Sequence, residues 1–152
     1  MRIVLDAPVL IRAHRRAKSR AKRLLDSLLE GGHRLVLSNE LIAETVKVLR
    51  YPRFKQIYRL SDADLLEYTQ YLQSLADLVI LDPHYAVSVL RDPKDMHVLQ
   101  TAECGAADVL CTNDGDFGED PAVIAYCRSK GIDVYDESSL LARLLREPSK
   151  TQ

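Results

Sequence analysis

Short apolar segments alternate with longer amphipathic segments along most of this chain. The apolar segments predict strands over residues 2–6, 34–38, 78–81, 109–112 and 133–135. The amphipathic segments predict helices over residues 19–30, 40–49, 61–75, 95–104, 121–130 and 138–146. Apolar strands separated by helices indicate a central parallel sheet covered on both faces, which is a three-layer α/β/α fold.

Polar residues with helix-capping side chains stand where these helices are expected to begin. Ser19 precedes the first helix, and Ser38 or Asn39 precedes the second. Ser61 and Asp64 have the spacing of a capping box, with aspartate in the place of the usual glutamate. The helix boundaries are therefore expected to be set by local hydrogen bonds.

The composition is that of an ordinary globular protein. Hydrophobic residues make up 47% of the 152 residues and charged residues 28%. We expect one domain over residues 1–146, followed by a short tail over residues 147–152. No apolar run approaches the roughly 20 residues that span a bilayer, and the first residues do not have the pattern of a signal peptide. The sequence thus predicts a cytoplasmic protein with no membrane partner.

The three cysteines do not form a metal-binding pattern. Their number is odd and no CxxC occurs, so we interpret them as small apolar residues in a reducing compartment. The four histidines fit no zinc-ligand spacing.

Basic residues are concentrated near the N-terminus although the net charge is −1. The segment from Arg12 to Arg23 holds seven Lys or Arg residues and no acidic residue. Such a segment is either an RNA-contacting surface or a solvated helix face. The candidate RNA-binding residues are Arg12, Arg15, Arg16, Lys18 and Arg20.

Carboxylates stand where two expected strands end. Asp6 closes the first strand, and Asp114 and Asp116 follow the fourth. Sites of parallel α/β proteins form outside the carboxyl ends of the strands, which makes these residues candidates for chemistry. For each residue alone, a turn aspartate that caps the next helix is an equally open interpretation.

Two further acids lie on apolar helix faces. Leu41 precedes Glu44 by three positions, and Val98 follows Asp95 by three, so each acid shares a face with a core residue. A carboxylate there is costly unless a partner compensates it, and a buried salt bridge is the alternative. If these acids converge with those at the strand ends, a divalent cation would relieve their repulsion. Oxygen ligands favour Mg²⁺ or Mn²⁺.

Four segments in order resemble the PIN-domain family, in particular its toxin-component branch. They are residues 4–6, 37–44, 91–95 and 105–114, and the resemblance extends over residues 2–145. It implies an Mg²⁺- or Mn²⁺-dependent ribonuclease that cuts RNA to leave a 5′-phosphate, with a small antitoxin partner and a homodimeric state. The residues carried over are Asp6, Glu44, Asp95 and Asp114 as catalytic metal ligands, Asp116 as a further ligand, and Thr112 as the supporting hydroxyl.

One departure from the family pattern follows the first acid. The family usually carries Ser or Thr and then Asn there, whereas this chain has Ala7 and Pro8. A PIN-like module that binds RNA or protein without cutting is therefore the alternative function. A phosphatase of the haloacid dehalogenase type needs an aspartate at the position of Pro8, and a response-regulator receiver needs a lysine at that of Asp136.

Overall fold

A five-stranded, all-parallel sheet forms the centre of the molecule. The computed structural model describes residues 1–14, 17–84 and 95–147, and of Asp116 only the backbone. The strand order is β3-β2-β1-β4-β5. The bounds are Arg2–Leu5 for β1, Arg34–Ser38 for β2, Asp77–Val79 for β3, Val109–Cys111 for β4 and Asp133–Tyr135 for β5. The predicted parallel sheet is confirmed.

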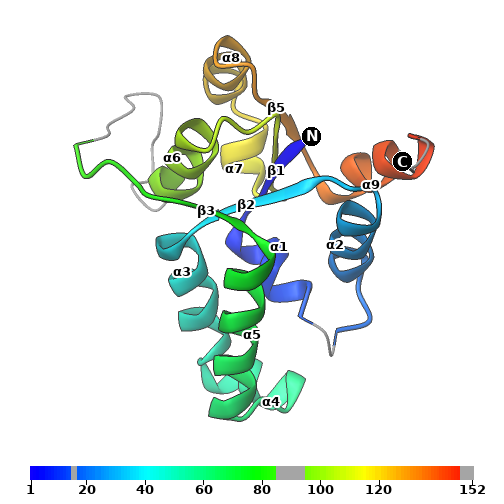
Figure 1. The fold of residues 1–152 in the computed structure, drawn as a ribbon, viewed down its shortest axis with the longest axis vertical. Helices are drawn as coiled ribbons and strands as arrows, with labels where there is room; N and C mark the ends of the chain where they lie inside the picture. Colours follow the sequence, from blue (N-terminus) through cyan, green and yellow to red (C-terminus); the bar gives the residue numbers. More distant parts are fainter. Residues whose placement is uncertain (15–16, 85–94, 148–152) are drawn as a thin grey trace.

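Helices flank this sheet on both sides (Figure 1). The bounds are Ala7–Arg12 for α1, Arg20–Glu30 for α2, Asn39–Leu49 for α3, Pro52–Tyr58 for α4, Asp62–Leu75 for α5, Met96–Cys104 for α6, Gly115–Gly118 for α7, Pro121–Ser129 for α8 and Glu137–Arg146 for α9. Helices α6 and α8 lie on one side of the sheet, and α1 and α2 lie on the other, where α9 packs on α2. None of the described helices has the length and apolarity needed to cross a membrane.

The predicted caps are present. The Ser19 hydroxyl accepts from Lys22 N–H at the start of α2, and the Ser38 hydroxyl caps α3. Ser61 and Asp64 form the reciprocal capping box of α5. These helix starts are set by side chains within three residues of the first turn, which is why sequence alone could locate them.

Three helices were not predicted: α1, α4 and the four-residue α7, and the first two have a proline in their first turn. Pro8 lies in the first turn of α1, and Pro52 opens α4 directly after α3. Proline fits the first turn of a helix because the N–H groups there have no intrahelical partner.

The third strand lies earlier than predicted. The apolar run over residues 78–81 suggested the strand, but β3 covers Asp77–Val79, and Ile80 is 95% exposed. As an edge strand, β3 pairs only with β2, where Val36 lies opposite Asp77. Pairing with the end of β2 fixes the boundary of β3, whereas the apolar run does not.

Gly105, which ends α6, is required by close packing against the sheet. A methyl group there would lie 2.5 Å from Val36 Cγ1 and 2.8 Å from the carbonyl oxygen of Thr101. We expect Gly105→Ala to lower the free energy of unfolding by about 1–3 kcal/mol, since overpacked cores cost that much. Thermal unfolding checks this, at roughly 2–4 °C for each kcal/mol. The control is Ala106→Gly, which relaxes a left-handed residue with φ of 49° in the same turn and should not lower the melting temperature. An unchanged melting temperature for Gly105→Ala would contradict the packing argument.

Candidate metal centre

Asp6 is held by two hydrogen bonds at the carboxyl end of β1. It is the N-cap of α1, and its Oδ1 accepts from Ala7 N–H at 2.7 Å. Its Oδ2 accepts from the Thr112 hydroxyl at 2.8 Å. Its own N–H donates to the carbonyl oxygen of Cys111, which continues the pairing of β1 with β4. The carboxylate is thus fixed in orientation by both neighbouring elements.

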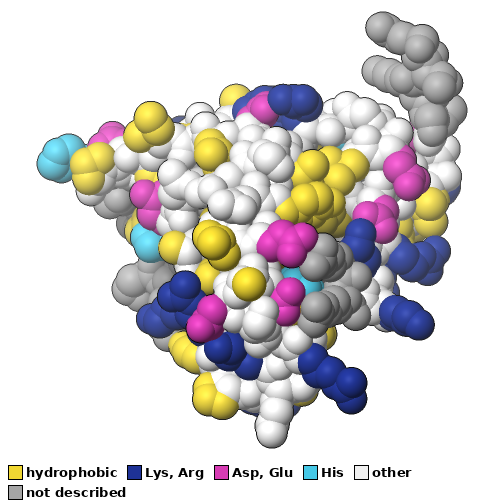
Figure 2. Space-filling view, turned by 60° about the horizontal axis from the view of Figure 1, so that its bottom comes forward, with side chains coloured by type: hydrophobic (Ala, Val, Ile, Leu, Met, Phe, Trp, Pro, Cys, Tyr) yellow, Lys and Arg dark blue, Asp and Glu magenta, His cyan; other side chains and the backbone are white. Residues whose placement is uncertain are grey.

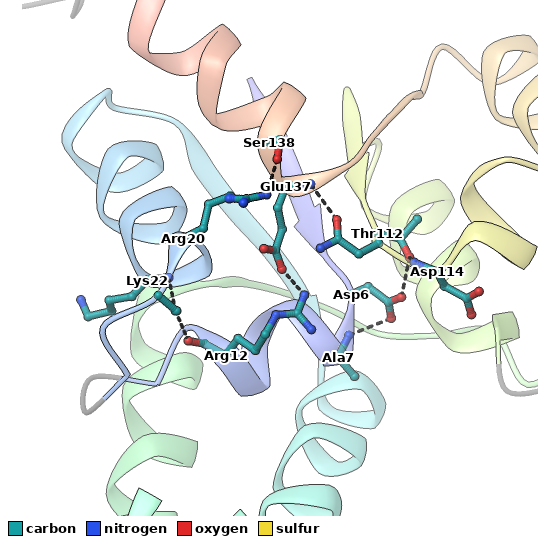
Figure 3. Close-up of polar contacts among 11 residues, drawn as sticks. Asp6, Ala7, Arg12, Arg20, Lys22, Thr112, Asp114, Glu137 and Ser138 are labelled. Atoms are coloured by element: carbon teal, nitrogen blue, oxygen red, sulfur yellow. Dashed lines mark hydrogen bonds and ion pairs between the residues drawn. The ribbon is translucent and has the colours of Figure 1, made fainter. Parts of the chain in front are cut away.

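Thr112 joins Asp6 to Asp114. The Thr112 hydroxyl donates to Asp6 and accepts from Asp114 N–H at 3.1 Å (Figure 3). Thr112 is buried directly after β4, and Asp114 is exposed at the start of α7. The structure therefore brings together the first and fourth predicted acids through the hydroxyl residue expected to support them.

The carboxylate of Asp6 lies in an environment that disfavours its charge. Burial raises the pKa of Asp6 above its ordinary value of 3.8, and the nearby negative charge of Asp114 adds to that rise. The hydrogen bonds from Thr112 and Ala7 and the positive charge of Arg12 act in the opposite direction on this pKa. A bound cation would offset both the burial and the repulsion. The carboxylates of Asp6 and Asp114 have the oxygen donors that Mg²⁺ and Mn²⁺ prefer.

Pro8, where the chain departs from the family pattern, leaves the Asp6 hydrogen bonds intact. Pro8 is exposed in the first turn of α1. The Asp6 carbonyl oxygen accepts from Val9 and Leu10, and the Asp6 carboxylate accepts from Ala7. Proline is therefore compatible with the geometry of Asp6, because the N–H that it lacks is not one that α1 uses.

Glu44 lies in a separate groove on α3. It is half-buried and lines a hollow of about 470 Å³ beside His97 of α6. The other lining residues are Glu40, Ala43, Lys47, Val48 and Tyr51. As the sequence indicated, Leu41 on the same helix is buried. The Glu44 side chain thus lines a groove between its own helix, α3, and α6.

Asp95 is the half-buried residue that immediately precedes α6. The backbone of Asp116 lies in α7, and its side chain is outside the described part of the chain. Among the described side chains, no group of three or more His, Cys, Asp or Glu residues is arranged to hold a metal ion. Thr112 therefore connects Asp6 with Asp114, whereas Glu44 on α3 and Asp95 directly before α6 are not arranged with them as a metal-binding group among the described side chains.

The candidate RNA-binding residues differ in their surroundings. Arg12 forms an ion pair with Glu137, whereas the exposed Arg20 donates to the Ser138 hydroxyl (Figure 3). Lys18 is exposed. Arg15 and Arg16 lie outside the described residues. On the face drawn in Figure 2, Lys and Arg side chains lie in separate groups with acidic side chains among them.

The end of the last strand, β5, lines a cleft beside the candidate metal centre, and the sequence analysis did not predict this. A cleft of about 700 Å³ adjoins Asp114 and is lined by Arg20, Thr112, Asn113, Gly115, Gly118, Glu119, Val134, Tyr135, Asp136, Ser138 and Ser139. Asn113 accepts from the Glu137 N–H at 2.9 Å and so ties the end of β4 to α9. The carboxyl-end rule applied to β5 would have pointed to Glu137, which follows that strand by two positions.

The chain was compared with protein families, curated proteins and solved structures. A family model described as "PIN domain" matches residues 2–116. No curated protein matches the chain in sequence. Among solved structures, a PilT N-terminus domain protein from the hyperthermophilic archaeon Sulfolobus solfataricus P2 is similar at 16% identity. The match covers 100% of this chain and 100% of that chain, with a TM-score of 0.49.

Proposed function

The chain belongs to the PIN-domain family, a family of nucleases that typically bind divalent metals, and from this premise we propose that it is an Mg²⁺- or Mn²⁺-dependent endoribonuclease. The observation that carries the proposal is the pairing of Asp6 with Asp114 through the Thr112 hydroxyl. The Thr112 hydroxyl contacts the Asp6 carboxylate and the backbone N–H of Asp114, so both acids lie at the carboxyl end of the parallel sheet, where a hard cation could bind their oxygens.

The residues of the candidate metal centre either bind the cation or hold a ligand in place. Asp6 and Asp114 bind the cation, and Thr112 keeps Asp6 in its binding orientation. By the family resemblance, Glu44 on α3, Asp95 before α6 and Asp116 would be the further ligands, and they would have to approach Asp6 and Asp114 when the cation binds. When bound, the cation neutralises charge on the scissile phosphate and makes water more acidic. A carboxylate of the set that is not fully used by the cation orients the attacking water.

The direct test is cleavage of a single-stranded RNA by the purified full chain. We expect cleavage with Mg²⁺ or Mn²⁺, loss of cleavage with EDTA, and recovery when the metal is added back. Cleavage that persists in EDTA would contradict the proposal. RNA binding without cleavage would favour the alternative, a catalytically weakened PIN-like module that acts by binding RNA or protein.

Cation binding is expected to stabilise the fold. Mg²⁺ or Mn²⁺ at 100 times its dissociation constant contributes about 2.7 kcal/mol, which raises the melting temperature by roughly 5–10 °C in a chain of this size. Thermal scans with and without metal measure the shift. Asp114→Asn should reduce it, whereas Asp26→Asn should not, because Asp26 pairs with Lys22 on the surface of α2. Equal shifts in both variants would place the cation elsewhere.

The exposed residues Lys18 and Arg20, of which Arg20 lines the cleft, are expected to bring RNA to the acidic centre. Replacing both Lys18 and Arg20 by alanine should weaken RNA binding and make it less dependent on salt. The slope of log affinity against log salt concentration should become shallower by about 0.7 for each lost phosphate contact. Filter binding at several salt concentrations measures both quantities. Arg128→Ala, on the exposed face of α8, is the matched control. A salt slope that changes equally in the control would contradict this role for Lys18 and Arg20.

We propose further that the protein is the toxin component of a toxin–antitoxin pair, with a small antitoxin as partner and a homodimeric state. The support is the resemblance of its four acidic segments to that branch of the family. Co-expression with the product of an adjacent small gene should suppress RNA cleavage and yield a co-purifying complex. Light scattering measures the oligomeric state. Full cleavage activity in the presence of the adjacent product would contradict the pairing.

A further inference from the structure

Glu137 is a buried acid that the proposed ligand set does not use. It is the first residue of α9, and it is only 4% exposed. Its carboxylate forms an ion pair with the guanidinium of Arg12, whose side chain is 38% exposed. A buried carboxylate persists only where a partner compensates its charge, and Arg12 is that partner.

Arg12 lies close enough to Asp6 to affect it. Asp6 is the N-cap of α1 and Arg12 is the last residue of the same short helix. Figure 3 shows the Arg12 side chain directed toward Glu137, with Asp6 beside the pair. Burial raises the pKa of Asp6, and the positive charge of Arg12, which lies beside Asp6 in Figure 3, offsets a small part of that rise. An unpaired guanidinium at this position would therefore be an internal competitor for the Asp6 carboxylate.

A second contact connects Glu137 to the same centre. Its backbone N–H donates to the Asn113 side chain, and Asn113 lies between Thr112 and Asp114. Since Thr112 hydrogen-bonds Asp6, the contacts close a ring that runs from Asp6 along α1 to Arg12, across to Glu137, and back through Asn113 and Thr112. The Asp6 carboxylate and the backbone N–H of Asp114 are both attached to this ring through Thr112.

We propose that Glu137 is a positioning residue that holds the Arg12 guanidinium away from Asp6, so that a divalent cation and not arginine occupies that carboxylate. The inference rests on the proposed metal-dependent function. In this proposal the ion pair between Arg12 of α1 and Glu137 of α9 controls the affinity of the centre for metal. It also explains why a basic residue is tolerated one helix length from an acidic metal centre.

Glu137→Gln isolates the charge of this residue. The amide keeps the shape and the backbone N–H that Asn113 accepts, and the freed Arg12 can still be hydrated because its side chain is 38% exposed. The metal-free melting temperature should therefore change little. Mn²⁺ affinity, measured by calorimetry on the full chain, should weaken by about 10–100-fold, the range typical of residues that hold metal ligands in place.

The double variant Arg12→Gln/Glu137→Gln distinguishes competition from simple structural damage. Removing the freed guanidinium should restore most of the Mn²⁺ affinity that Glu137→Gln loses. Glu103→Gln is the matched control, because Glu103, like Glu137, forms an ion pair with a basic side chain, that of Lys130, and it lies outside the ring. It should leave Mn²⁺ affinity unchanged.

The outcomes separate this inference from the proposed function. If the wild-type chain binds no Mn²⁺, both fail. If the wild type binds Mn²⁺ and Glu137→Gln binds it equally well, only the inference is overturned. If Glu137→Gln binds weakly and the double variant is no better, Arg12 is not the competitor and the inference is overturned as well. Loss followed by rescue supports it.

Discussion

Replacing Asp6 by asparagine is expected to lower the rate of metal-dependent RNA cleavage by at least about 100-fold without loss of the fold. The variant removes the negative charge that binds the cation and keeps nearly the same shape. The amide oxygen still accepts from Ala7 N–H, and the amide nitrogen can donate to the Thr112 hydroxyl, which has a second lone pair. Single-turnover cleavage in Mn²⁺ measures the loss.

The stability of Asp6→Asn relative to wild type is expected to depend on pH. Burial and the charge of Asp114 raise the pKa of Asp6 in the folded state, so the unfolded chain releases this proton first as pH rises. The ionised Asp6 carboxylate therefore lowers the free energy of unfolding. This loss is absent below pH 3.8 and fully present once the pH exceeds the raised pKa of Asp6 in the folded state. Metal-free Asp6→Asn should accordingly be at least as stable as wild type at pH 7, and the difference should vanish at low pH.

Thermal unfolding of both proteins without metal, over a range of pH values, measures whether Asp6→Asn is more stable than wild type at pH 7 and whether the difference disappears at low pH. Asp26→Asn is the control, because Asp26 lies on the surface of α2 and should affect neither cleavage nor this pH dependence. A variant Asp6→Asn that unfolds at pH 7 would mean that Asp6 is a structural cap whose charge the fold requires. Retained cleavage would remove Asp6 from the metal centre.

Arg12→Ala is expected to destabilise the protein by about 2 kcal/mol, or roughly 4–8 °C in melting temperature. The variant leaves the Glu137 carboxylate, which is 4% exposed, without its ion-pair partner. Breaking a fully buried pair from one side costs about 3–5 kcal/mol, and the partial exposure of Arg12 reduces that figure through solvent screening.

The loss should be recovered largely in the double variant Arg12→Ala/Glu137→Gln, which removes the stranded charge. The expected asymmetry is that Glu137→Gln alone costs little, because the arginine left behind reaches water. Chemical denaturation of the four proteins gives the coupling energy directly. Equal losses in both single variants would show that packing, and not the buried charge, dominates at this contact.

The sequence by itself determined the elements that depend on local chemistry. The parallel sheet followed from short apolar runs separated by helices, and the capping box at Ser61 followed from two side chains three residues apart. Asp6 and Asp114 could be singled out because each follows an apolar strand. Helix α1 and the bounds of β3 were missed, because a proline in a first turn and the pairing of an edge strand both leave weak local signals.

Only the tertiary structure decided which of these residues meet. Thr112 reaches Asp6 across 106 residues of sequence because β4 pairs directly with β1. Arg12 meets Glu137 across 125 residues because α9 returns from the edge strand β5 to pack beside the N-terminal helices. Strand order and the packing of helices on the sheet are set by burial of the whole core, and no local pattern encodes them. For that reason the sequence identified the acidic residues of the candidate centre, while the ion pair that is proposed to control them became visible only in the fold.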